Sequence, residues 1–501
     1  MPTLARRWRR REPQDTVLYQ TLAAHLETFL ARLEDDDTRP PLPRFVVREL
    51  HDFLKCGILV HGFCRVHCDT CGKDELVAFS CKHRGFCPAC GTRRMADTAA
   101  WLVDRVFPEV PVRQWVLALP YPVRFLCAFD PPTARGVRRI FVRAVSGLYG
   151  KDACRRGIEK TKAAAVVFEQ RFDQALRLNL HYHGLWVDGT FACSLGKPDA
   201  DFHPIADVTD ADVERLVRAI RTRVLRFLHR TGKLTEEHTV DHEGLDPSTH
   251  HLLGAAAVQG RIALGPHAGA PVHRLGQGSQ PMRDFRRGPL CAAVDGFSLH
   301  AAVRVPAGAK ERLEKLCRYA ARPPIVHERL SLTPDGKVLY KFKRTFRDGS
   351  SHVVLDPLTF VGRLAALVPR PRVHLVTYHG MFAPAAPLRD RVVPPPPEDE
   401  VAQATPKSAP APAPCPHQPL PPTATRKPPA HKRHRYSWAE LLRRVFHIEV
   451  FLCDCGGQRR LLAAILEPEP IRRILLHLGL PADPPPVAPA RAPPGVALPW
   501  A

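Results

Sequence analysis

Two histidines one residue apart, His181 and His183, lie inside the apolar run 178–187. In a β-strand, residues i and i+2 point to the same face, so both imidazoles would be directed to one side and could bind one divalent cation. A single buried histidine is more often a packed core residue than a ligand, but two in register on one strand favour metal chemistry. The dipeptide Asp188-Gly189 predicts a hairpin turn directly after this strand.

A cysteine cluster contains two Cys-x2-Cys pairs, which are Cys68 with Cys71 and Cys87 with Cys90. Each pair can form a tight turn, and the spacing is typical of a zinc site with four thiolate ligands. A metal held by four thiolates has no open position for catalysis. We therefore expect a structural Zn²⁺ that stabilises a small module with little core of its own.

Four further cysteines lie outside this expected site. Cys64 and Cys81 are surplus within the cluster, although Cys81 could replace a member of the second pair. Cys453 and Cys455 are too close together for an ordinary zinc knuckle, and no second pair follows them. We assign the latter pair no catalytic role, and a DNA-contact role or a disordered basic arm are equally compatible with the segment around it.

Basic and aromatic side chains are interleaved around the cysteine cluster. The arginines are Arg84, Arg93 and Arg94, and the aromatic residues Phe79 and Phe86 lie in the same segment. Guanidinium groups beside aromatic rings suit phosphate contact and base stacking, whereas the alternative is an ordinary solvated basic face. The chain has a net charge of +23 and a pI of about 9.8, which also favours a nucleic-acid partner.

A tyrosine, Tyr319, is expected in the last turn of a helix over 308–321, because two prolines follow that helix. Arg318 and Arg322 lie beside it and could hold a phosphate near the phenol oxygen. A tyrosine in this position is ordinarily a packing residue. Together with the paired histidines, it becomes a candidate nucleophile for attack on phosphorus.

The pattern of apolar residues predicts an α+β fold with a mostly antiparallel sheet flanked by helices. We expect helices over 17–34, 43–54, 91–106, 133–149, 209–230, 308–321 and 357–368. Strands are expected at 115–119, 163–170, through the paired histidines and at 296–304, with a hairpin over 338–346 and 351–355 and a loop over 240–290.

The sequence also suggests how the chain is divided. We expect an N-terminal helical region (1–60), the zinc module (61–106), a catalytic domain (107–383), a Pro/Ala-rich linker (384–435), a small basic module (436–480) with a helix at 438–446, and a disordered tail (481–501). The fifteen cysteines and the lack of a signal peptide indicate a reducing compartment, the cytoplasm, with nucleoid association. No apolar stretch reaches the roughly 18 residues of a membrane span.

Several of these motifs together resemble the rolling-circle insertion-sequence transposases of the IS91-like family, including those of common-region elements, which belong to the HUH single-strand endonucleases. The resemblance runs from about 45 to 390, and its motifs are long enough to make chance a poor explanation. The matching stretches are Phe79 to Arg94, Gln170 to Phe172, Asn179 to His183, Gly296 to His300, Cys317 to Pro324, Phe360 to Pro369 and Tyr378 to Pro384.

The resemblance implies an HUH endonuclease domain after an N-terminal four-cysteine zinc-binding module, and a mechanism. His181 and His183 would hold Mg²⁺ or Mn²⁺, and Tyr319 would attack a single DNA strand to form a 5′-phosphotyrosine with a free 3′-OH. HUH enzymes usually add a third ligand from the same sheet. We favour Gln170 for this role, with His300 as the rival.

Three questions stay open at the level of sequence. A plasmid replication initiator or relaxase would use the same chemistry, and a non-catalytic zinc-dependent DNA-binding regulator would use none. Some relatives carry two tyrosines four residues apart, whereas here Lys315 and Pro323 occupy the positions four either side of Tyr319. One tyrosine used twice, or two protomers, would then be needed for cleavage and rejoining, and the oligomeric state is not determined.

Overall fold

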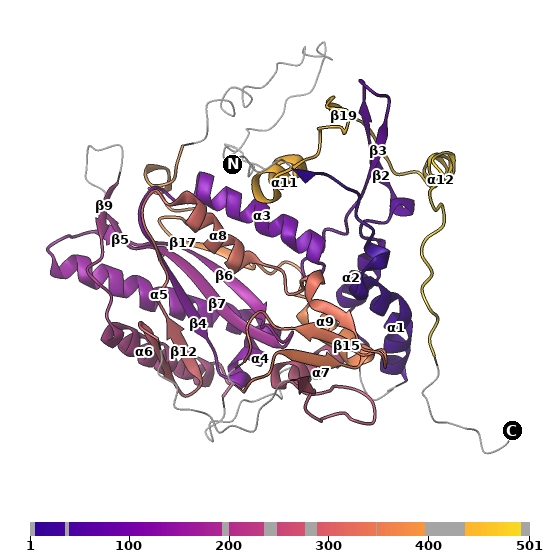
Figure 1. Ribbon diagram of the computed structural model, residues 1–501. Helices are drawn as coiled ribbons and strands as arrows, with labels where there is room; N and C mark the ends of the chain where they lie inside the picture. Colours follow the sequence, from indigo (N-terminus) through magenta and orange to yellow (C-terminus); the bar gives the residue numbers. More distant parts are fainter. Residues whose placement is uncertain are drawn as a thin grey trace, which may run out of the picture.

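The computed structural model describes residues 6–35, 40–192, 200–234, 248–275, 288–346, 348–395 and 436–491. It is a mixed structure in which helices cover a central antiparallel sheet (Figure 1), as the apolar pattern predicts. The expected linker 384–435 lies mainly outside the described residues, because only 384–395 of it are described.

The central sheet has seven strands, and every neighbouring pair is antiparallel. Its order is β11 (Cys291–Val294), β12 (Phe297–His300), β4 (Val112–Ala118), β7 (Leu178–Val187), β6 (Ala164–Phe172) and β17 (Val376–Gly380), with β13 (Arg304–Val305) also paired with β4. Strand β7, which contains both histidines, therefore lies between β4 and β6 in the middle of the sheet.

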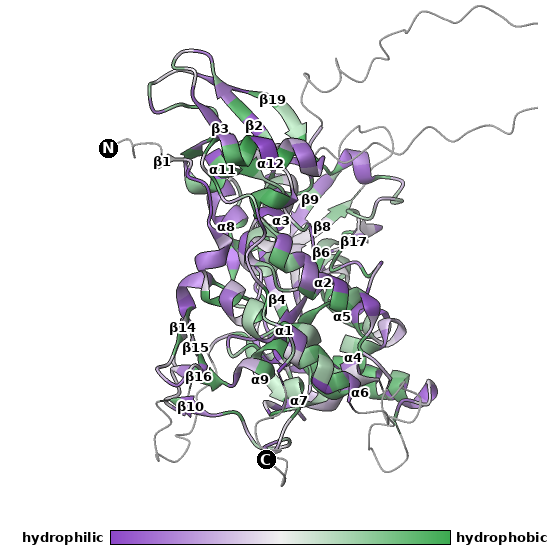
Figure 2. Cartoon of the chain, turned by 90° about the vertical axis from the view of Figure 1, so that its right-hand side faces the viewer, coloured by the Kyte–Doolittle hydropathy of each residue, from purple (hydrophilic) through white to green (hydrophobic). Residues whose placement is uncertain are grey.

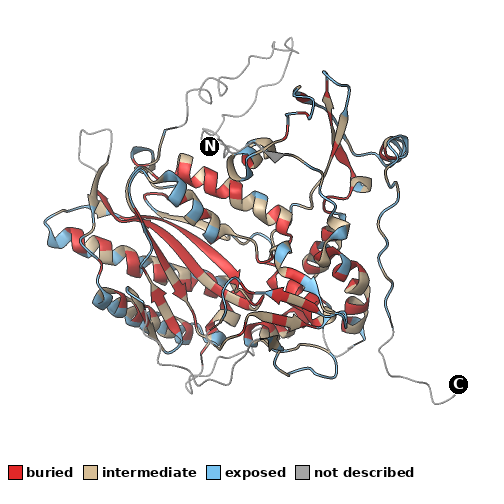
Figure 3. Ribbon diagram, viewed as in Figure 1, coloured by how far each residue is buried: buried red, intermediate tan, exposed pale blue. Residues whose placement is uncertain are grey.

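Helices cover both faces of this sheet, so β6 and β7 are buried along almost their whole length (Figure 3). On one face, α3 (Pro88–Arg105) and α8 (Lys310–Ala321) pack against Val166, Phe168 and Leu185. On the other face, α4 (Tyr121–Phe129) and α5 (Pro131–Arg155) pack against Tyr182 and Trp186, with α6 (Asp210–Arg230) beside α5. Alternate residues of β7 thus enter two different cores.

A group of helices closes one end of the sheet. It consists of α1 (Val17–Glu34), α2 (Arg44–Lys55), α7 (Thr249–Gln259) and α9 (Pro357–Leu367). Helix α7 lies within 240–290, where we expected a loop, so that prediction is wrong for this segment. The helices α4, α7 and α9 are largely hydrophobic (Figure 2). Helix α7 buries Leu253, Ala257 and Val258, but its less buried side is also mostly apolar, with Leu252, Ala255 and Ala256. A helix that is apolar on both sides lacks the one-sided apolar stripe by which helices are recognised.

The predicted turn at Asp188-Gly189 is also wrong. Strand β8 (Gly189–Ala192) does not fold back on β7 but pairs with β5 (Thr161–Lys162) and β9 (Asp201–Pro204) in a separate sheet. The Asp188 carboxylate is buried and accepts hydrogen bonds from Arg113, Arg304 and Tyr149, so it serves an ion-pair network and not a tight turn.

A four-stranded sheet and short 3-10 helices complete the larger part of the described structure. The expected hairpin over 338–355 is confirmed as part of this sheet, whose order is β10 (Arg274–Leu275), β16 (His352–Leu355), β15 (Val338–Lys341) and β14 (Leu330–Leu332). The short helices are η1 (Pro13–Asp15), η2 (Leu59–His61), η3 (His327–Arg329) and η4 (Arg389–Arg391).

The C-terminal module returns to the N-terminal part of the chain (Figure 1). It contains α11 (Trp438–Phe446), β18 (Ile448–Glu449), β19 (Arg459–Ile465) and α12 (Pro468–His477). Strand β19 pairs with β2 (Phe63–Cys68), which pairs in turn with β3 (Asp74–Ala78), and β18 pairs with β1 (Arg6–Arg7).

The tail 481–501 was expected to be disordered, and the structure corrects this for its first half. The backbone N–H groups of Ala488 and Arg491 donate to the Ala23 carbonyl and the Thr28 hydroxyl, so this segment lies along α1. Residues 492–501 are outside the described part. In the described part of the chain, no helix is both long and apolar enough to cross a membrane.

Candidate functional site

Strand register places the two histidines and Gln170 on one face of the central sheet. His181 lies directly opposite Gln170 of β6, and His183 lies opposite Val116 of β4. Directly opposed residues share a face, and so do residues two apart in one strand. The two imidazole rings are 4.8 Å apart between centroids. The expected juxtaposition of His181, His183 and Gln170 is therefore present.

Tyr319 lies next to this pair. Helix α8 packs on the histidine face of the sheet, and the ring of Tyr319 meets the ring of His183 edge to face with 5.6 Å between centroids. Tyr319 is nevertheless 39% exposed, so the residue can be reached from solvent. Helix α8 ends two residues later at Ala321, before Pro323, which leaves Tyr319 in the last turn as predicted.

The hydrogen bonds of the two imidazoles decide which ring nitrogen could bind a metal. The Nδ1 atom of His181 lies 2.8 Å from the Asn179 carbonyl, which can only accept, so Nδ1 carries the proton and Nε2 has a free lone pair. The Nδ1 atom of His183 lies 3.1 Å from the side-chain amide nitrogen of Gln114, and its Nε2 is buried without a hydrogen-bond partner in the described structure. An amide nitrogen only donates, so in this orientation Nδ1 accepts and the Nε2 of the neutral ring carries the proton; with the Gln114 amide turned by 180°, its oxygen would accept from Nδ1–H and leave the Nε2 lone pair for a metal. A partner on one ring nitrogen that leaves the other free is usual for metal-binding histidines.

Burial keeps both rings neutral. It lowers the pKa of His181 to about 4, and the nearby cation of Arg322 acts in the same direction. The pKa of His183 is also far below its usual value, because of burial first and then the neighbouring His181 and Arg322. At neutral pH, both side chains are therefore free bases that can donate electron pairs to a cation.

Gln170 connects the metal face to the tyrosine helix. Its amide nitrogen donates to the main-chain carbonyls of Tyr319 and Ala320 at 3.5 and 3.3 Å, while its oxygen lies 3.5 Å from an Arg322 nitrogen. The rival ligand, His300, also projects from this face but lies on β12, two strands away from His183. Strands are about 4.8 Å apart, so Gln170 lies nearer to the histidine pair than His300 does.

The arginines expected to contact DNA differ in their surroundings. The guanidinium carbon of Arg322 lies 4.5 Å from the centroid of the Tyr319 ring, so its charge lies beside the candidate nucleophile. In contrast, Arg84 donates to the carbonyls of Val373 and Arg370. Arg94 likewise donates to main-chain carbonyls, those of residues 82 and 83.

Because their guanidinium groups are hydrogen-bonded to main-chain carbonyls, Arg84 and Arg94 have a structural role in and around the cysteine module. These contacts do not favour the DNA-contact role expected for the two residues. Arg93 is exposed on α3, and Arg318 is partly exposed on α8 beside Tyr319. Both remain candidates for phosphate contact.

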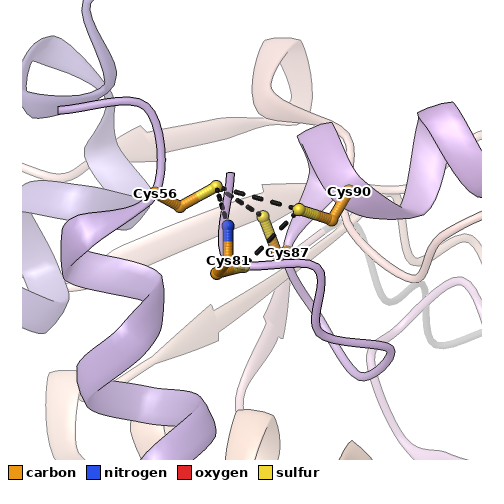
Figure 4. Close-up of side chains that lie close together, drawn as sticks. All are labelled: Cys56, Cys81, Cys87 and Cys90. Atoms are coloured by element: carbon orange, nitrogen blue, oxygen red, sulfur yellow. Dashed lines mark hydrogen bonds between the residues drawn. The ribbon is translucent and has the colours of Figure 1, made fainter. Parts of the chain in front are cut away.

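Four cysteines meet in the N-terminal module, but they are not the four that spacing predicted. Cys56, Cys81, Cys87 and Cys90 direct their sulfur atoms toward one another (Figure 4). The Cys56 sulfur lies 3.6 Å from that of Cys87 and 3.8 Å from that of Cys90, and Cys81 lies 3.5 Å from Cys90. Tetrahedral zinc with Zn–S bonds of about 2.3 Å requires sulfur separations of about 3.8 Å. The group therefore fits a Zn²⁺ ion.

The expected single site of Cys68, Cys71, Cys87 and Cys90 is corrected by this arrangement. Cys87 and Cys90 lie at the start of α3, where Pro88 begins the helix, and Cys56 joins them from the end of α2. The pair Cys68 and Cys71 lies instead at the far end of the β2–β3 hairpin, in a second group with Cys453 and Cys455.

Other functional residues had weak or absent signals in the sequence. Cys56 has no partner at Cys-x2-Cys spacing, and its only signal is its position before Gly57 at the end of a predicted helix. Gln114 lies in a strand and has no motif of its own. Among the described residues, Cys64 belongs to neither cysteine group.

Comparisons with known proteins bear on these two regions. Residues 165–389 match a family model described as "Putative transposase", and residues 22–119 match the model of the IS91 "Transposase zinc-binding domain". The first range includes the paired histidines, Gln170 and Tyr319, and the second includes Cys56, Cys81, Cys87 and Cys90. No curated protein and no solved structure matches the chain.

Proposed function

Because this chain belongs to the IS91-like transposases, we propose that it cuts and rejoins single DNA strands in rolling-circle transposition, with Tyr319 as the nucleophile. The observation that supports this most directly is the contact between His183 and Tyr319, 5.6 Å between ring centroids, at a tyrosine that is 39% exposed. An accessible tyrosine next to two neutral imidazoles on one sheet face is what metal-assisted phosphoryl transfer requires.

In this proposal, His181, His183 and the oxygen of Gln170 hold Mg²⁺ or Mn²⁺. The bound ion would polarise the scissile phosphate and offset the negative charge that develops on its oxygens. The free Nε2 lone pair of His181 supports this assignment. The buried Nε2 of His183 has no hydrogen-bond partner, and it would become the second ligand once the Gln114 side-chain oxygen, in place of its nitrogen, faces Nδ1.

The chain's own residues then carry the covalent step. The Tyr319 hydroxyl gives its proton to solvent and attacks phosphorus, so that a Tyr–O–P bond forms as the bond from phosphorus to the 3′ oxygen breaks, and the departing 3′ oxygen takes up a proton from solvent. The products are a 5′-phosphotyrosine and a free 3′-OH. Attack by a 3′-OH on the phosphotyrosine reverses the exchange, joins the strands and frees the tyrosine. One phosphodiester bond is conserved throughout, so no ATP is required.

Cationic side chains around Tyr319 would bind the DNA backbone. Arg322 lies over the tyrosine ring, and the Lys343 amine is 5.5 Å from the centroid of the same ring. Their charges would position the phosphate and stabilise a phenolate leaving group during rejoining.

The zinc-binding domain has a structural role in this proposal. Cys56, Cys81, Cys87 and Cys90 hold Zn²⁺ and fix the start of α3 against the end of α2. Helix α3 packs along α8, so the metal also supports the helix that presents Tyr319.

The test uses the full chain with labelled single-stranded oligonucleotides that cover both ends of the DNA element, in the presence of Mg²⁺. Denaturing gels should show a covalent protein–DNA adduct that is lost in Tyr319→Phe and in His181→Ala or His183→Ala. Tyr121→Phe is the matched control, because Tyr121 is also exposed and begins α4, which packs against β7.

Two outcomes would refute the tyrosine assignment. Nicked DNA without any adduct would indicate a water nucleophile, and loss of the adduct in Tyr121→Phe but not in Tyr319→Phe would move the nucleophile to α4. A comparison of Gln170→Ala with His300→Ala identifies the third ligand. Only the substitution that removes the ligand should raise the Mn²⁺ concentration needed for half-maximal adduct formation.

A further inference from the structure

A second group of four cysteines joins the two ends of the chain. Cys68 and Cys71 lie at the turn between β2 and β3, while Cys453 and Cys455 lie between β18 and β19. The sulfur of Cys68 is 3.6 Å from that of Cys455, and the sulfur of Cys71 is 3.6 Å from that of Cys453. Only the first pair falls inside the matched zinc-binding domain, which ends at residue 119.

The separations fit a shared metal and not disulfides. A disulfide holds its sulfurs about 2.05 Å apart, whereas ligands of tetrahedral zinc are about 3.8 Å apart. All four sulfurs lie within 4.8 Å of one another, so one ion can reach each of them. No oxygen or nitrogen ligand belongs to the group, and an all-thiolate set of four selects a soft tetrahedral ion such as Zn²⁺.

The two halves of the group have the same local design. In each half, a glycine with positive φ directly follows the second cysteine: Gly72 at +70° and Gly456 at +85°. Such a glycine closes a tight turn that directs both thiols to one side. The turns also pack closely, because a Cβ on Gly457 would lie 2.3 Å from the Thr70 hydroxyl.

We propose that Cys68, Cys71, Cys453 and Cys455 bind a second structural Zn²⁺ that fastens the C-terminal module to the β2–β3 hairpin. The module needs such a support because its own core is small. Among the described residues, the core between the hairpin and α12 has four fully buried members, Phe63, Leu76, Ile471 and Leu475, with partly buried apolar residues around them, which is little apolar surface for a stable unit. This proposal rests on geometry and is independent of the proposed strand-transfer chemistry.

The attachment extends from this metal to the tyrosine helix. At the other end of the C-terminal module, Arg444 of α11 forms ion pairs with Asp104 of α3 and with Glu314 of α8. A module fastened at both ends would therefore hold α8 in place. We expect metal loss at this site to free the module while the distant Cys56 group keeps its ion.

Thiol alkylation of the unaltered full chain is the first test. Cys71, Cys154 and Cys455 are all exposed, but only Cys154 lies outside both cysteine groups. With a reductant present, iodoacetamide and peptide mass spectrometry should show rapid labelling of Cys154 and at least tenfold slower labelling of Cys71 and Cys455. A strong zinc chelator should abolish the difference. Equal labelling without chelator, or protection that survives chelation, would overturn the proposal.

Metal counting is the second test. Elemental analysis of the purified full chain should give two zinc ions per chain, Cys453→Ser/Cys455→Ser should give one, and the matched control Cys154→Ser should give two. A native chain with a single zinc, or a double variant that retains two, contradicts the second site. The alkylation test stands even if the double variant does not fold.

Discussion

Loss of the buried Asp188 carboxylate should strongly destabilise the central sheet. Asp188 is 1% exposed, and its carboxylate accepts two hydrogen bonds from Arg113, at 2.8 and 3.0 Å, one from Arg304 at 2.7 Å and one from the Tyr149 hydroxyl at 3.1 Å. In Asp188→Ala, the half-exposed Arg304 can regain water, but the buried Arg113 cannot. An uncompensated buried charge costs about 3–5 kcal/mol, which is roughly a 150- to 5,000-fold loss in the folding equilibrium.

The assay is guanidinium unfolding followed by tryptophan fluorescence, because Trp115 and Trp186 are buried in the same sheet. Asp335→Ala is the control, since its exposed ion pair with Lys337 should leave the unfolding midpoint unchanged. Replacing both partners, in Arg113→Met/Asp188→Leu, removes the orphaned charge and should recover much of the loss. The reasoning is refuted if Asp188→Ala unfolds like Asp335→Ala, or if the double variant is no more stable than the single one.

Three further predictions concern packing, pH and the C-terminal module. Gly184→Ala should lower the free energy of unfolding by about 1–3 kcal/mol, since its Cβ would lie 2.0 Å from the Trp186 ring; an unchanged denaturation midpoint would contradict this. Burial lowers the pKa of His181 to about 4 and that of His250 to about 3. Below pH 6.5, these two imidazoles therefore bind protons in the unfolded chain but stay neutral in the folded chain. Stability should thus be full above pH 6.5 and fall as pH decreases toward 4, by roughly 2 kcal/mol for each group at pH 5; a thermal midpoint equal at pH 7 and pH 5 would disprove it. Arg444→Met should lower the free energy of unfolding by only about 1 kcal/mol, because the Arg444 side chain is partly exposed. The same substitution should increase hydrogen exchange in α8, which carries Tyr319. Unaltered exchange in α8 would exclude coupling through Arg444.

The candidate site was predictable because its geometry follows from local rules. The period of two in a strand places His181 and His183 on one face, and the prolines after α8 place Tyr319 in a last turn. The same alternation distinguishes Gln170 from its neighbour Glu169, which points into the opposite core. What brings the strand and the helix together is long-range packing, and this part rested on the family resemblance.

Local rules do not predict how the cysteines are grouped. Spacing indicates that Cys68 and Cys71 act as a pair, and likewise Cys87 and Cys90, but it does not indicate which pairs share an ion. The partners of Cys68 and Cys71 lie more than 380 residues further along the chain. Helix α7 was missed for a related reason, since its burial depends on helices from distant parts of the sequence, as at Gly254, where a Cβ would lie 2.1 Å from the Phe129 ring.

The pairing of β2 with β19 has a consequence for synthesis of the protein. A ribosome releases residues 63–68 long before their strand partner at 459–465 emerges. Until then, the hairpin has one edge without hydrogen-bond partners, a state that invites association with other chains. A product that stops before residue 459 would keep that edge permanently, so premature termination should yield aggregation-prone polypeptides even though the central sheet is intact.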